Sequence, residues 1–285
     1  MKTTVLVFPF DLFGTGGAAA GALLLADAVQ EMLADNKREK IATRARAYQE
    51  HVQLKELGFD KLADYEDWQT RARTTIRKIW QRDEFLLWIA GNHLGTLPVY
   101  EELASETDGT LVIQFDAHLD VYNLSGCTTE LSHGNFLRHC KGPLPAIVNL
   151  GHRDLFLRPS YVERYYQRAF SAAELAIDPE PALAYLGAAC RNAKRVFLDF
   201  DCDAFDPAYF PAVGHALPFG LNPPLVLRLL DSVFSERVAG MALSEFEPSR
   251  DVNDRSLAML IWLVEYLLLK RYEPQKSASK PTRTS

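Results

Sequence analysis

Short apolar runs rich in branched and aromatic residues alternate along this chain with longer stretches whose apolar residues recur at helical spacing. The short runs predict strands over residues 5–10, 85–90, 111–115, 146–150, 195–200 and 240–243. The longer stretches predict amphipathic helices over residues 19–33, 64–80, 98–105, 163–170, 179–191, 224–235 and 256–272. Strands that alternate with helices are typical of a parallel sheet covered by helices. The pattern therefore predicts an α/β fold with a central, mostly parallel sheet.

The apolar residues are spread evenly enough to form one core. They make up 48% of the 285 residues, and no internal repeat or Pro/Gly/Ser-rich linker divides the chain. We expect one α/β domain over residues 1–272. Residues 273–285 are mainly Lys, Ser, Thr and Pro without apolar periodicity, so burial cannot offset the entropy lost on ordering them. We predict a flexible tail there.

Charge and cysteine content limit the function classes. A formal net charge of -6 offers no basic patch for nucleic acid, and no apolar run is long enough to cross a membrane. The apolar start of the chain is predicted as the first strand, because a secretory signal would need basic residues before a longer apolar stretch. The cysteines form no C-x-x-C pair, which argues against a disulfide framework and a thiolate zinc site. We expect a cytoplasmic protein.

Side chains that bind metals follow three of the predicted strands. The segments are Gly91-Asn92-His93, Asp116-Ala117-His118-Leu119-Asp120 and Asp201-Cys202-Asp203. In an open parallel sheet, ligands bind at the edge formed by the carboxyl ends of the strands. We therefore expect these three segments to converge at one edge of the sheet.

The spacing within the segments predicts which side chains face the site. Alternate residues of an extended segment point the same way, so Asp116, His118 and Asp120 are expected on one side, where they could nearly surround one ion. The same rule places Asp201 and Asp203 together. It turns the intervening thiol of Cys202 away, and we exclude that thiol as a ligand.

The six side chains supply two imidazoles and four carboxylates. Two divalent cations would balance the four negative charges, which would be costly to bury alone. Oxygen ligands with some imidazole favour manganese, with cobalt, nickel or iron as competitors. We predict two divalent metal ions, Mn²⁺ first among them. The alternative is that the segment at 116–120 forms a solvated turn and that Asp201 and Asp203 cap a helix.

These segments resemble the signature motifs of the ureohydrolase family of arginases and agmatinases. The family's G-G-D-H motif corresponds to residues 91–93, its D-A-H-x-D motif to 116–120, and its S-x-D-x-D-x-x-D-P motif to 199–207. The similarity runs in order over residues 85–248. It implies a single-domain, three-layer arginase-like fold, a small guanidino-type substrate and a homo-oligomer. It also implies the metal ligands His93, Asp116, His118, Asp120, Asp201 and Asp203.

The resemblance implies roles for further residues. His133, in Ser132-His133-Gly134, corresponds to the family's proton shuttle, and an imidazole titrates near neutral pH. Glu245 corresponds to a carboxylate that binds the guanidinium group, a pair that can be bidentate. Asp120 is expected to accept a hydrogen bond from the attacking water. The alternatives are a surface histidine without a role and a strand-end carboxylate paired with a neighbouring arginine.

Several positions depart from the family pattern. Asn92, Leu94 and Asp199 stand where Asp, Ser and Ser are common, which keeps all six ligands but changes the groups that orient them and leaves their effect on activity open. Tyr122 and Phe156 stand where arginases bind the amino-acid end of arginine with polar side chains.

We expect Tyr122, Phe156 and Glu245 to bind the substrate, with an agmatinase-like preference over L-arginine. Arg158, if it lies near the rim, would favour an acidic guanidino or formimino compound. The expected products are urea, or a simple amide, and an amine.

Two other functions remain open. Histone deacetylases resemble this fold and use D-x-H and a later aspartate with one zinc ion, so a single-zinc amide hydrolase is the rival enzyme, separated by counting metals. A metal-binding family member without catalytic turnover is the other, and a screen of guanidino compounds for urea release would address it.

Overall fold

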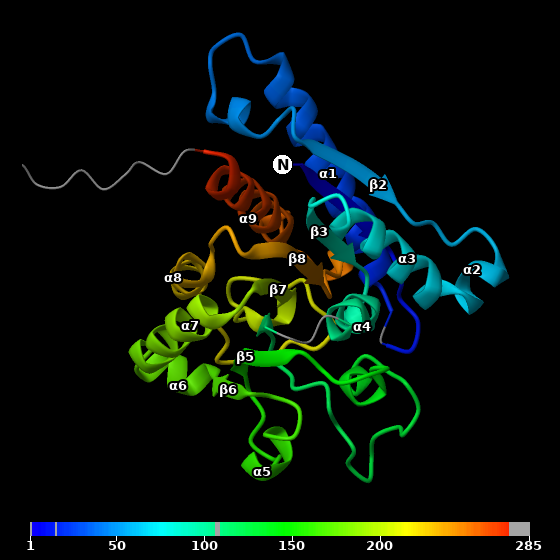
Figure 1. The fold of residues 1–285 in the computed structure, drawn as a ribbon, viewed down its shortest axis with the longest axis vertical. Coiled ribbons are helices and arrows are strands. Elements are labelled where there is room, and N and C mark those ends of the chain that lie inside the picture. Colours follow the sequence, from blue (N-terminus) through cyan, green and yellow to red (C-terminus); the bar gives the residue numbers. More distant parts are fainter. Residues whose placement is uncertain (1, 15, 106–108, 274–285) are drawn as a thin grey trace, which may run out of the picture.

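Eight strands form the centre of the fold in this computed structural model, which describes residues 2–14, 16–105 and 109–273 (Figure 1). The strands are β1 (Thr3–Phe8), β2 (Val52–Glu56), β3 (Phe85–Ala90), β4 (Thr110–Phe115), β5 (Ala146–His152), β6 (Arg168–Ser171), β7 (Arg195–Asp201) and β8 (Val238–Ser244). They lie in one sheet in the order β2-β1-β3-β8-β7-β4-β5-β6, and every neighbouring pair is parallel. The predicted α/β fold with a parallel sheet is confirmed.

Helices cover both faces of the sheet and complete three layers (Figure 1). They are α1 (Ala18–Arg38), α2 (Leu62–Glu66), α3 (Trp68–Trp80), α4 (Leu97–Ala104), α5 (Pro159–Val162), α6 (Ala172–Ile177), α7 (Glu180–Asn192), α8 (Pro223–Val233) and α9 (Arg255–Tyr272). Val5 and Val7 of β1 belong to a core cluster with α1, α7, α8 and α9, whereas Leu6 and Phe8 belong to a second cluster with α3 and α4. Because both faces are covered, the strands are continuous apolar runs instead of alternating ones.

One predicted helix is wrong. Residues 163–170 were expected to be helical, but the short helix α5 ends at Val162 and β6 begins at Arg168. The apolar spacing of Tyr166 and Phe170 suits a helix turn, yet pairing with β5 satisfies the backbone from Gln167 onward, whose N–H donates to Ile147 O at 2.9 Å. A tertiary contact therefore outweighs the local helical pattern.

Two further boundaries differ from the prediction. The helix expected over residues 64–80 is divided at Asp67 into α2 and α3. The strand β2 was not predicted, because it lies at the edge of the sheet and only partly buries its residues. Neither change affects the edge of the sheet where the metal-type side chains collect.

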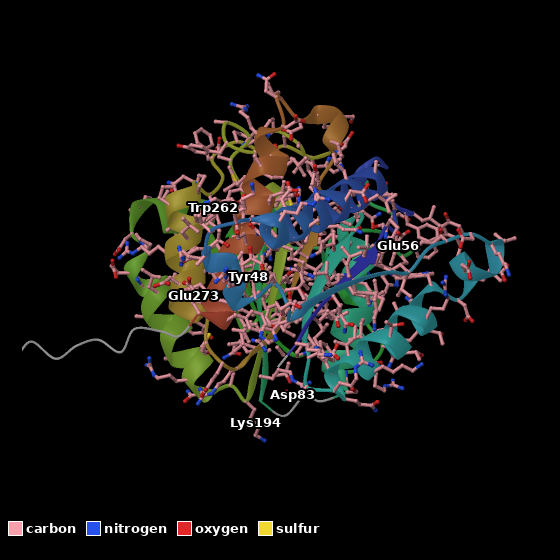
Figure 2. The ribbon with its side chains drawn as sticks, turned by 90° about the horizontal axis from the view of Figure 1, so that it is seen from above. Tyr48, Glu56, Asp83, Lys194, Trp262 and Glu273 are labelled. Atoms are coloured by element: carbon pink, nitrogen blue, oxygen red, sulfur yellow. The ribbon has the colours of Figure 1, made fainter. Side chains whose placement is uncertain are left out.

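The region after α1 is fastened to α9. The Tyr48 hydroxyl donates to Glu265 Oε1 at 2.6 Å and accepts from Asn36 Nδ2 at 2.9 Å, and Figure 2 shows Tyr48 beside α9. At the end of α9, Glu273 forms an ion pair with Arg44. The first residue of the predicted tail is thus held against the fold. The rest of that tail, 274–285, lies outside the described residues, and the domain boundary stays a prediction.

No helix within residues 2–14, 16–105 and 109–273 is long and apolar enough to cross a membrane.

Candidate metal centre

Four neighbouring strands in the middle of the sheet, β3, β8, β7 and β4, end at the same level. Ile89 pairs with Leu243, Leu243 with Phe200, and Phe200 with Phe115. Each strand therefore releases its chain at the same edge, and the residues that follow must share one space. The two outer members of this group, β3 and β4, are consecutive in sequence but separated by β8 and β7, an arrangement that opens a crevice at the strand ends.

The turn after β3 requires a glycine. A Cβ atom on Gly91 would lie 2.2 Å from Phe10 O, so no side chain fits there. The chain then enters a short 3₁₀ helix that begins at His93. The backbone N–H of His93 donates to Glu245 Oε1 at 2.9 Å and so ties the ends of β3 and β8 together.

In the turn after β7, one oxygen of Asp201 caps a helix and the other faces the candidate metal site. Asp201 Oδ1 accepts the backbone N–H of Asp203 at 2.9 Å and caps a 3₁₀ helix. Helix capping was the alternative to metal binding that the sequence left open for this residue. Only one oxygen is used in this way, and Oδ2 faces His93. Cys202 is fully buried in the apolar core on the other side, consistent with its exclusion as a ligand.

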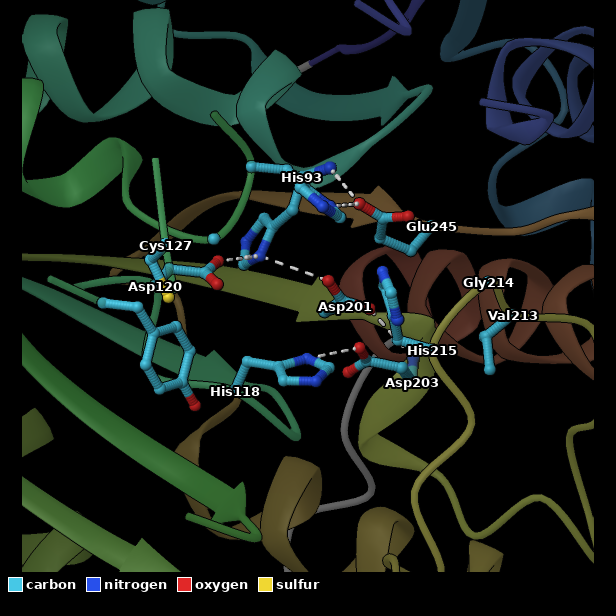
Figure 3. Close-up of a pocket in the computed structure, with 13 residues that line it drawn as sticks. His93, His118, Asp120, Cys127, Asp201, Asp203, Val213, Gly214, His215 and Glu245 are labelled. Atoms are coloured by element: carbon cyan, nitrogen blue, oxygen red, sulfur yellow. Dashed lines mark hydrogen bonds and ion pairs between the residues drawn. The ribbon is translucent and has the colours of Figure 1, made fainter. Parts of the chain in front are cut away.

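An inner group of side chains surrounds His93 Nδ1. This nitrogen lies 2.8 Å from Asp120 Oδ2 and 3.2 Å from Asp201 Oδ2 (Figure 3), and 3.2 Å from Asp116 Oδ2. The His93 nitrogen and the Asp116 and Asp120 oxygens are buried and have no hydrogen-bond partner within the described chain. Buried polar atoms without partners are costly, and a cation held among them would satisfy them.

An outer group surrounds His118. Its Nδ1 lies 2.8 Å from Asp203 Oδ2 and 3.8 Å from Asp116 Oδ1, so Asp116 is shared with the inner group. The expectation that Asp116, His118 and Asp120 surround one ion is wrong, because Asp120 approaches His93 and His118 approaches Asp203. The physical reason is that the segment is not extended throughout: Asp120 has a φ of 47°.

Burial and mutual repulsion shift the protonation of these groups. Burial, together with the charge of Asp120, raises the pKa of Asp116 to about 8, and burial and Asp203 raise the pKa of Asp201 well above its usual range. Burial opposes the charged form of His118, but Asp203 outweighs it and raises the pKa to about 10. Without a cation the cluster therefore binds protons to limit its negative charge.

The donor set fits a pair of divalent cations. Each group, His93 with Asp116 and Asp120 and His118 with Asp116 and Asp203, could hold a metal ion. The donors are carboxylate oxygens and imidazole nitrogens, which suit hard or borderline divalent metals. The structure thus brings all six predicted ligands together, and their role as ligands stays a prediction.

Glu245 and His133 meet beside the two groups. His133 Nδ1 lies 3.1 Å from Glu245 Oε1. The same oxygen accepts from the His93 backbone, and Figure 3 shows Glu245 beside His93. Burial opposes charge on His133, but Glu245 outweighs it and raises the pKa of His133. Glu245 also has a φ of 60°, a left-handed conformation that costs a residue with a side chain on the order of 1 kcal/mol. Strain of this kind is common where a side chain must be aimed into a site.

The two groups open into a cavity of about 320 Å³. It is lined by His93, His118, Asp120, Tyr122, Cys127, His133, Gly134, Asp201, Asp203, Val213, Gly214, His215 and Glu245. Tyr122 therefore lies where it was predicted. Phe156 does not: it is 76% exposed and is absent from this lining. Arg158, considered as a rim residue, is an exposed N-cap of α5 and is absent from the lining too.

His215 also lines the cavity and was not predicted from the sequence. Its ring lies 5.6 Å from that of His133 and 6.1 Å from that of His118, and Figure 3 shows it among the pocket residues. Burial and the two neighbouring imidazoles lower the pKa of His215. The residue sits in a long loop after β7 with no apolar period, so only its residue type could have drawn attention to it.

Arg153 braces that loop. Its guanidinium donates to the backbone carbonyls of Asp203 and Phe205, both at 2.8 Å, from within a partly buried site. A Cβ atom on Gly220 would lie 2.0 Å from Arg153 Nη2, so glycine is needed for this close approach. Arg153 is committed to the backbone and is not available to a ligand in the cavity.

The fold and the two clusters define an α/β protein with a candidate binuclear metal site. The chain belongs to the arginase family, whose model matches residues 1–269. Members of this family are metal-dependent amidinohydrolases, and the resemblance seen in the motifs is confirmed.

Sequence similarity to individual arginases and agmatinases extends over part of the chain. Arginase 1 of Oryza sativa subsp. indica is 28% identical over 195 residues, which cover 65% of this chain and 55% of the relative. Agmatinase of Proteus mirabilis is 25% identical over 195 residues, 67% of this chain and 61% of the relative. The matched part thus spans less than two thirds of the length of these relatives.

Solved structures share the fold over nearly the whole chain. Arginase from Bacillus subtilis superposes with a TM-score of 0.76 at 19% identity, covering 94% of this chain and 98% of that one. Formimidoylglutamase from the same species superposes with a TM-score of 0.76 at 18% identity, covering 97% of this chain and 89% of that one. The similarity at this identity concerns the fold alone.

Proposed function

We propose that the protein hydrolyses a small, linear guanidino compound to urea and an amine with the help of two divalent metal ions. The observation that carries this proposal is the pair of His and Asp groups that share Asp116 and face the same cavity as Glu245. Membership of a family of amidinohydrolases supports it. Manganese is the proposed metal, because four carboxylates outnumber two imidazoles and no thiolate joins them.

The inner ion would be held by His93, Asp116 and Asp120, with Asp201 Oδ2 beside them, and the outer one by His118, Asp116 and Asp203. When bound, the two cations would lower the pKa of a water molecule between them and stabilise negative charge that develops during attack. Asp120 would accept a hydrogen bond from that water. Its left-handed backbone conformation aims the carboxylate at the inner group.

Glu245 orients the substrate in this proposal. Two donors already hold its Oε1, the His93 backbone and His133, so the carboxylate is positioned before a ligand arrives. A planar guanidinium binds a carboxylate through two parallel hydrogen bonds. This pairing would place the central carbon of the guanidinium over the two metal groups and would compete with His133 for Oε1.

His133 supplies the proton in this proposal. Glu245 holds its Nδ1 proton and favours the charged imidazole, which leaves Nε2 to protonate the departing amine. Water adds its oxygen to the guanidinium carbon, the C–N bond to the substrate tail breaks, and the products are urea and the free amine.

The cavity favours a substrate tail without a carboxylate. No Lys or Arg is among the described residues that line it, Arg153 is bound to backbone carbonyls, and Arg158 lies elsewhere. A tail carboxylate would thus enter the cavity without a Lys or Arg to pair with among these residues, at a cost of several kcal/mol when desolvated. This supports an agmatinase-like substrate over L-arginine or an acidic formimino compound. Tyr122 offers an apolar wall for a methylene chain.

The test is a screen for urea release by protein loaded with Mn²⁺, across agmatine, arginine, guanidinobutyrate and free guanidine, with the metal content counted in parallel. We expect two ions per chain and the highest kcat/KM with agmatine. One tightly bound zinc ion and amide cleavage would favour the deacetylase-like alternative. Two bound ions with no urea from any compound would contradict hydrolysis and leave a metal-binding protein.

We also propose a homo-oligomer, which the family resemblance implies, and a cytoplasmic location, which the scattered cysteines favour. Size-exclusion chromatography with light scattering and cell fractionation would test them.

A further inference from the structure

The two histidines of the metal centre differ in what holds their second nitrogen. His93 Nε2 lies 2.9 Å from Asp199 Oδ2, and both residues are buried. The side chain of His118 is 24% exposed, and no hydrogen bond to its Nε2 is found within residues 2–14, 16–105 and 109–273. One imidazole is thus anchored by a carboxylate and the other is not.

A chain of buried donors ends at Asp199. The Tyr100 hydroxyl donates to Asp199 Oδ2 at 2.6 Å, and Gln114 Nε2 donates to the Tyr100 oxygen at 3.3 Å. Gln114 Oε1 in turn accepts from Asn149 Nδ2 at 3.0 Å. Each group in this chain donates a hydrogen bond to the next, and Asp199 accepts the last one.

This network fixes the tautomer of His93. Tyr100 donates its only hydroxyl proton to Asp199, which accepts it as a carboxylate. The hydrogen bond between His93 and Asp199 therefore forms when the imidazole carries its proton on Nε2. The lone pair is then on Nδ1, the atom that faces Asp116, Asp120 and Asp201. Imidazoles held in this way by a carboxylate are stronger metal ligands.

The network also reaches the segment that carries His118. Asn149 Nδ2 lies 3.2 Å from His118 O, and the Tyr166 hydroxyl donates to the backbone of Leu119. These contacts hold the backbone of that segment and do not involve the imidazole of His118, whose Nδ1 contacts Asp203 Oδ2 at 2.8 Å. The difference between the two histidines therefore lies in the side chains and not in the backbone.

Asp199 contacts the inner group directly through His93. Its Oδ1 is buried without a hydrogen-bond partner in the described chain, and its ion pair there is with His93. A buried carboxylate without a cation is costly, and a cation on the far side of the imidazole would offset that cost. Its negative charge therefore favours a cation at the inner group more than at the outer group, which it does not contact.

We propose that Asp199 is a positioning residue that makes the inner metal site, around His93, bind its ion more tightly than the outer site, around His118. This rests on the proposed two-metal function. The site with the anchored imidazole fills first, and the outer site, nearer to solvent, fills second. Asp199 stands where the family commonly has serine, so this order is a property of this chain.

The test is a calorimetric titration of chelator-stripped protein with Mn²⁺. The wild type is expected to bind two ions in two resolved steps. Asp199→Asn, which keeps the shape and removes the charge, should weaken the tighter step by about 10-fold to 100-fold and leave the weaker step within about 3-fold. Asp199→Ser, which introduces the serine of the family motif, should do the same if the amide variant folds poorly.

Glu102→Gln is the matched control. Glu102 is a buried carboxylate paired with Arg73 and Arg77 away from the cavity, so the variant also loses a buried charge but should keep both binding steps. A loss of stability alone would lower melting temperature in both variants without changing one step selectively. Two unchanged steps in both Asp199 variants would overturn the proposal while the two-metal function stands. No Mn²⁺ binding by the wild type would overturn both.

Discussion

The carboxylates at the floor of the cavity are held far more tightly than the side chains at its rim. The floor comprises the six predicted ligands and Glu245, on the ends of four adjacent strands, and its aspartates are at most 4% exposed. The rim comprises residues 122–131 and 206–220, loops that supply Tyr122 and His215 to the lining, and Phe219 there is 83% exposed. Outside the lining, Leu155 and Phe156 are 100% and 76% exposed.

The difference separates two tasks. Strand ends and backbone donors hold the floor in place, and metal binding requires such precisely placed side chains. The loops of the rim include exposed side chains such as Phe219, and loops can differ between relatives without disturbing the floor. We therefore expect changes to the floor to abolish chemistry, and changes to the rim to alter the choice of substrate.

The largest effect is expected from Asp116→Ala. Asp116 is the carboxylate shared by the two groups, so its loss should remove metal from both and reduce kcat/KM by on the order of 10³-fold or more. Metal analysis and the urea assay would measure this, with circular dichroism to show that the variant folds. Turnover near the wild-type level would contradict the role of the floor.

Glu245→Gln should reduce kcat/KM for the best guanidino substrate by about 10²-fold, because the amide cannot neutralise a guanidinium. Metal content should not change, since Glu245 belongs to neither metal group. The control is Glu247→Gln, two residues further on, whose carboxylate pairs with Arg250 outside the cavity. If both variants lost activity equally, the effect would be structural.

His133→Asn should lower kcat by about 10²-fold with little change in KM or metal content, because the proton for the leaving amine is lost. In the wild type, kcat should fall as the pH rises through the raised pKa of His133, since only the protonated imidazole can donate. That alkaline limb should vanish in the variant, and a limb that persists unchanged would assign the proton to another group.

Metal-free and metal-loaded protein should respond to pH in opposite ways. In the metal-free fold, the pKa of Asp116 rises from 3.8 to about 8 and that of His118 from 6.5 to about 10. The folded state then binds more protons than the unfolded state, so stability falls as the pH rises from about 4 to about 10.

Between about pH 6 and pH 8 we expect the melting temperature of the metal-free protein to drop by roughly 5 °C. With Mn²⁺ in place of the protons it should hold or rise, because metal and protons compete for the same atoms. Parallel thermal melts with and without chelator would check this. Identical slopes would show that the floor binds no metal.

The smallest effects are expected at the rim of the cavity and just outside it. Phe156→Ser should change kcat/KM by less than about 2-fold, because an exposed side chain outside the lining contributes little. Tyr122→Ala, which removes part of the wall, should raise KM by about 10-fold with less change in kcat. A large effect of Phe156→Ser would restore its predicted role and show that the loop closes over the substrate.

Much of the site could be predicted from the sequence because its signals are local. The apolar runs at 85–90, 111–115 and 195–200 match strands within one residue, and the metal-type side chains directly follow them. Binding chemistry at strand ends depends on residue type and short spacing, both of which a sequence displays. The helix predicted at 163–170 failed for the converse reason, because pairing with β5 is not visible in local periodicity.

By itself, the sequence determined that this chain forms a parallel α/β sheet with six side chains of metal-binding types at its strand ends. Apolar periodicity and motif spacing are local properties that a sequence displays. Only the tertiary structure decided that β8 enters between β3 and β7 and places Glu245 against His93. It likewise placed Asp199 on one imidazole and His215 in the cavity, while it left Phe156 outside. These outcomes depend on long-range strand order and loop packing, whose free energy comes from contacts between residues far apart in the chain.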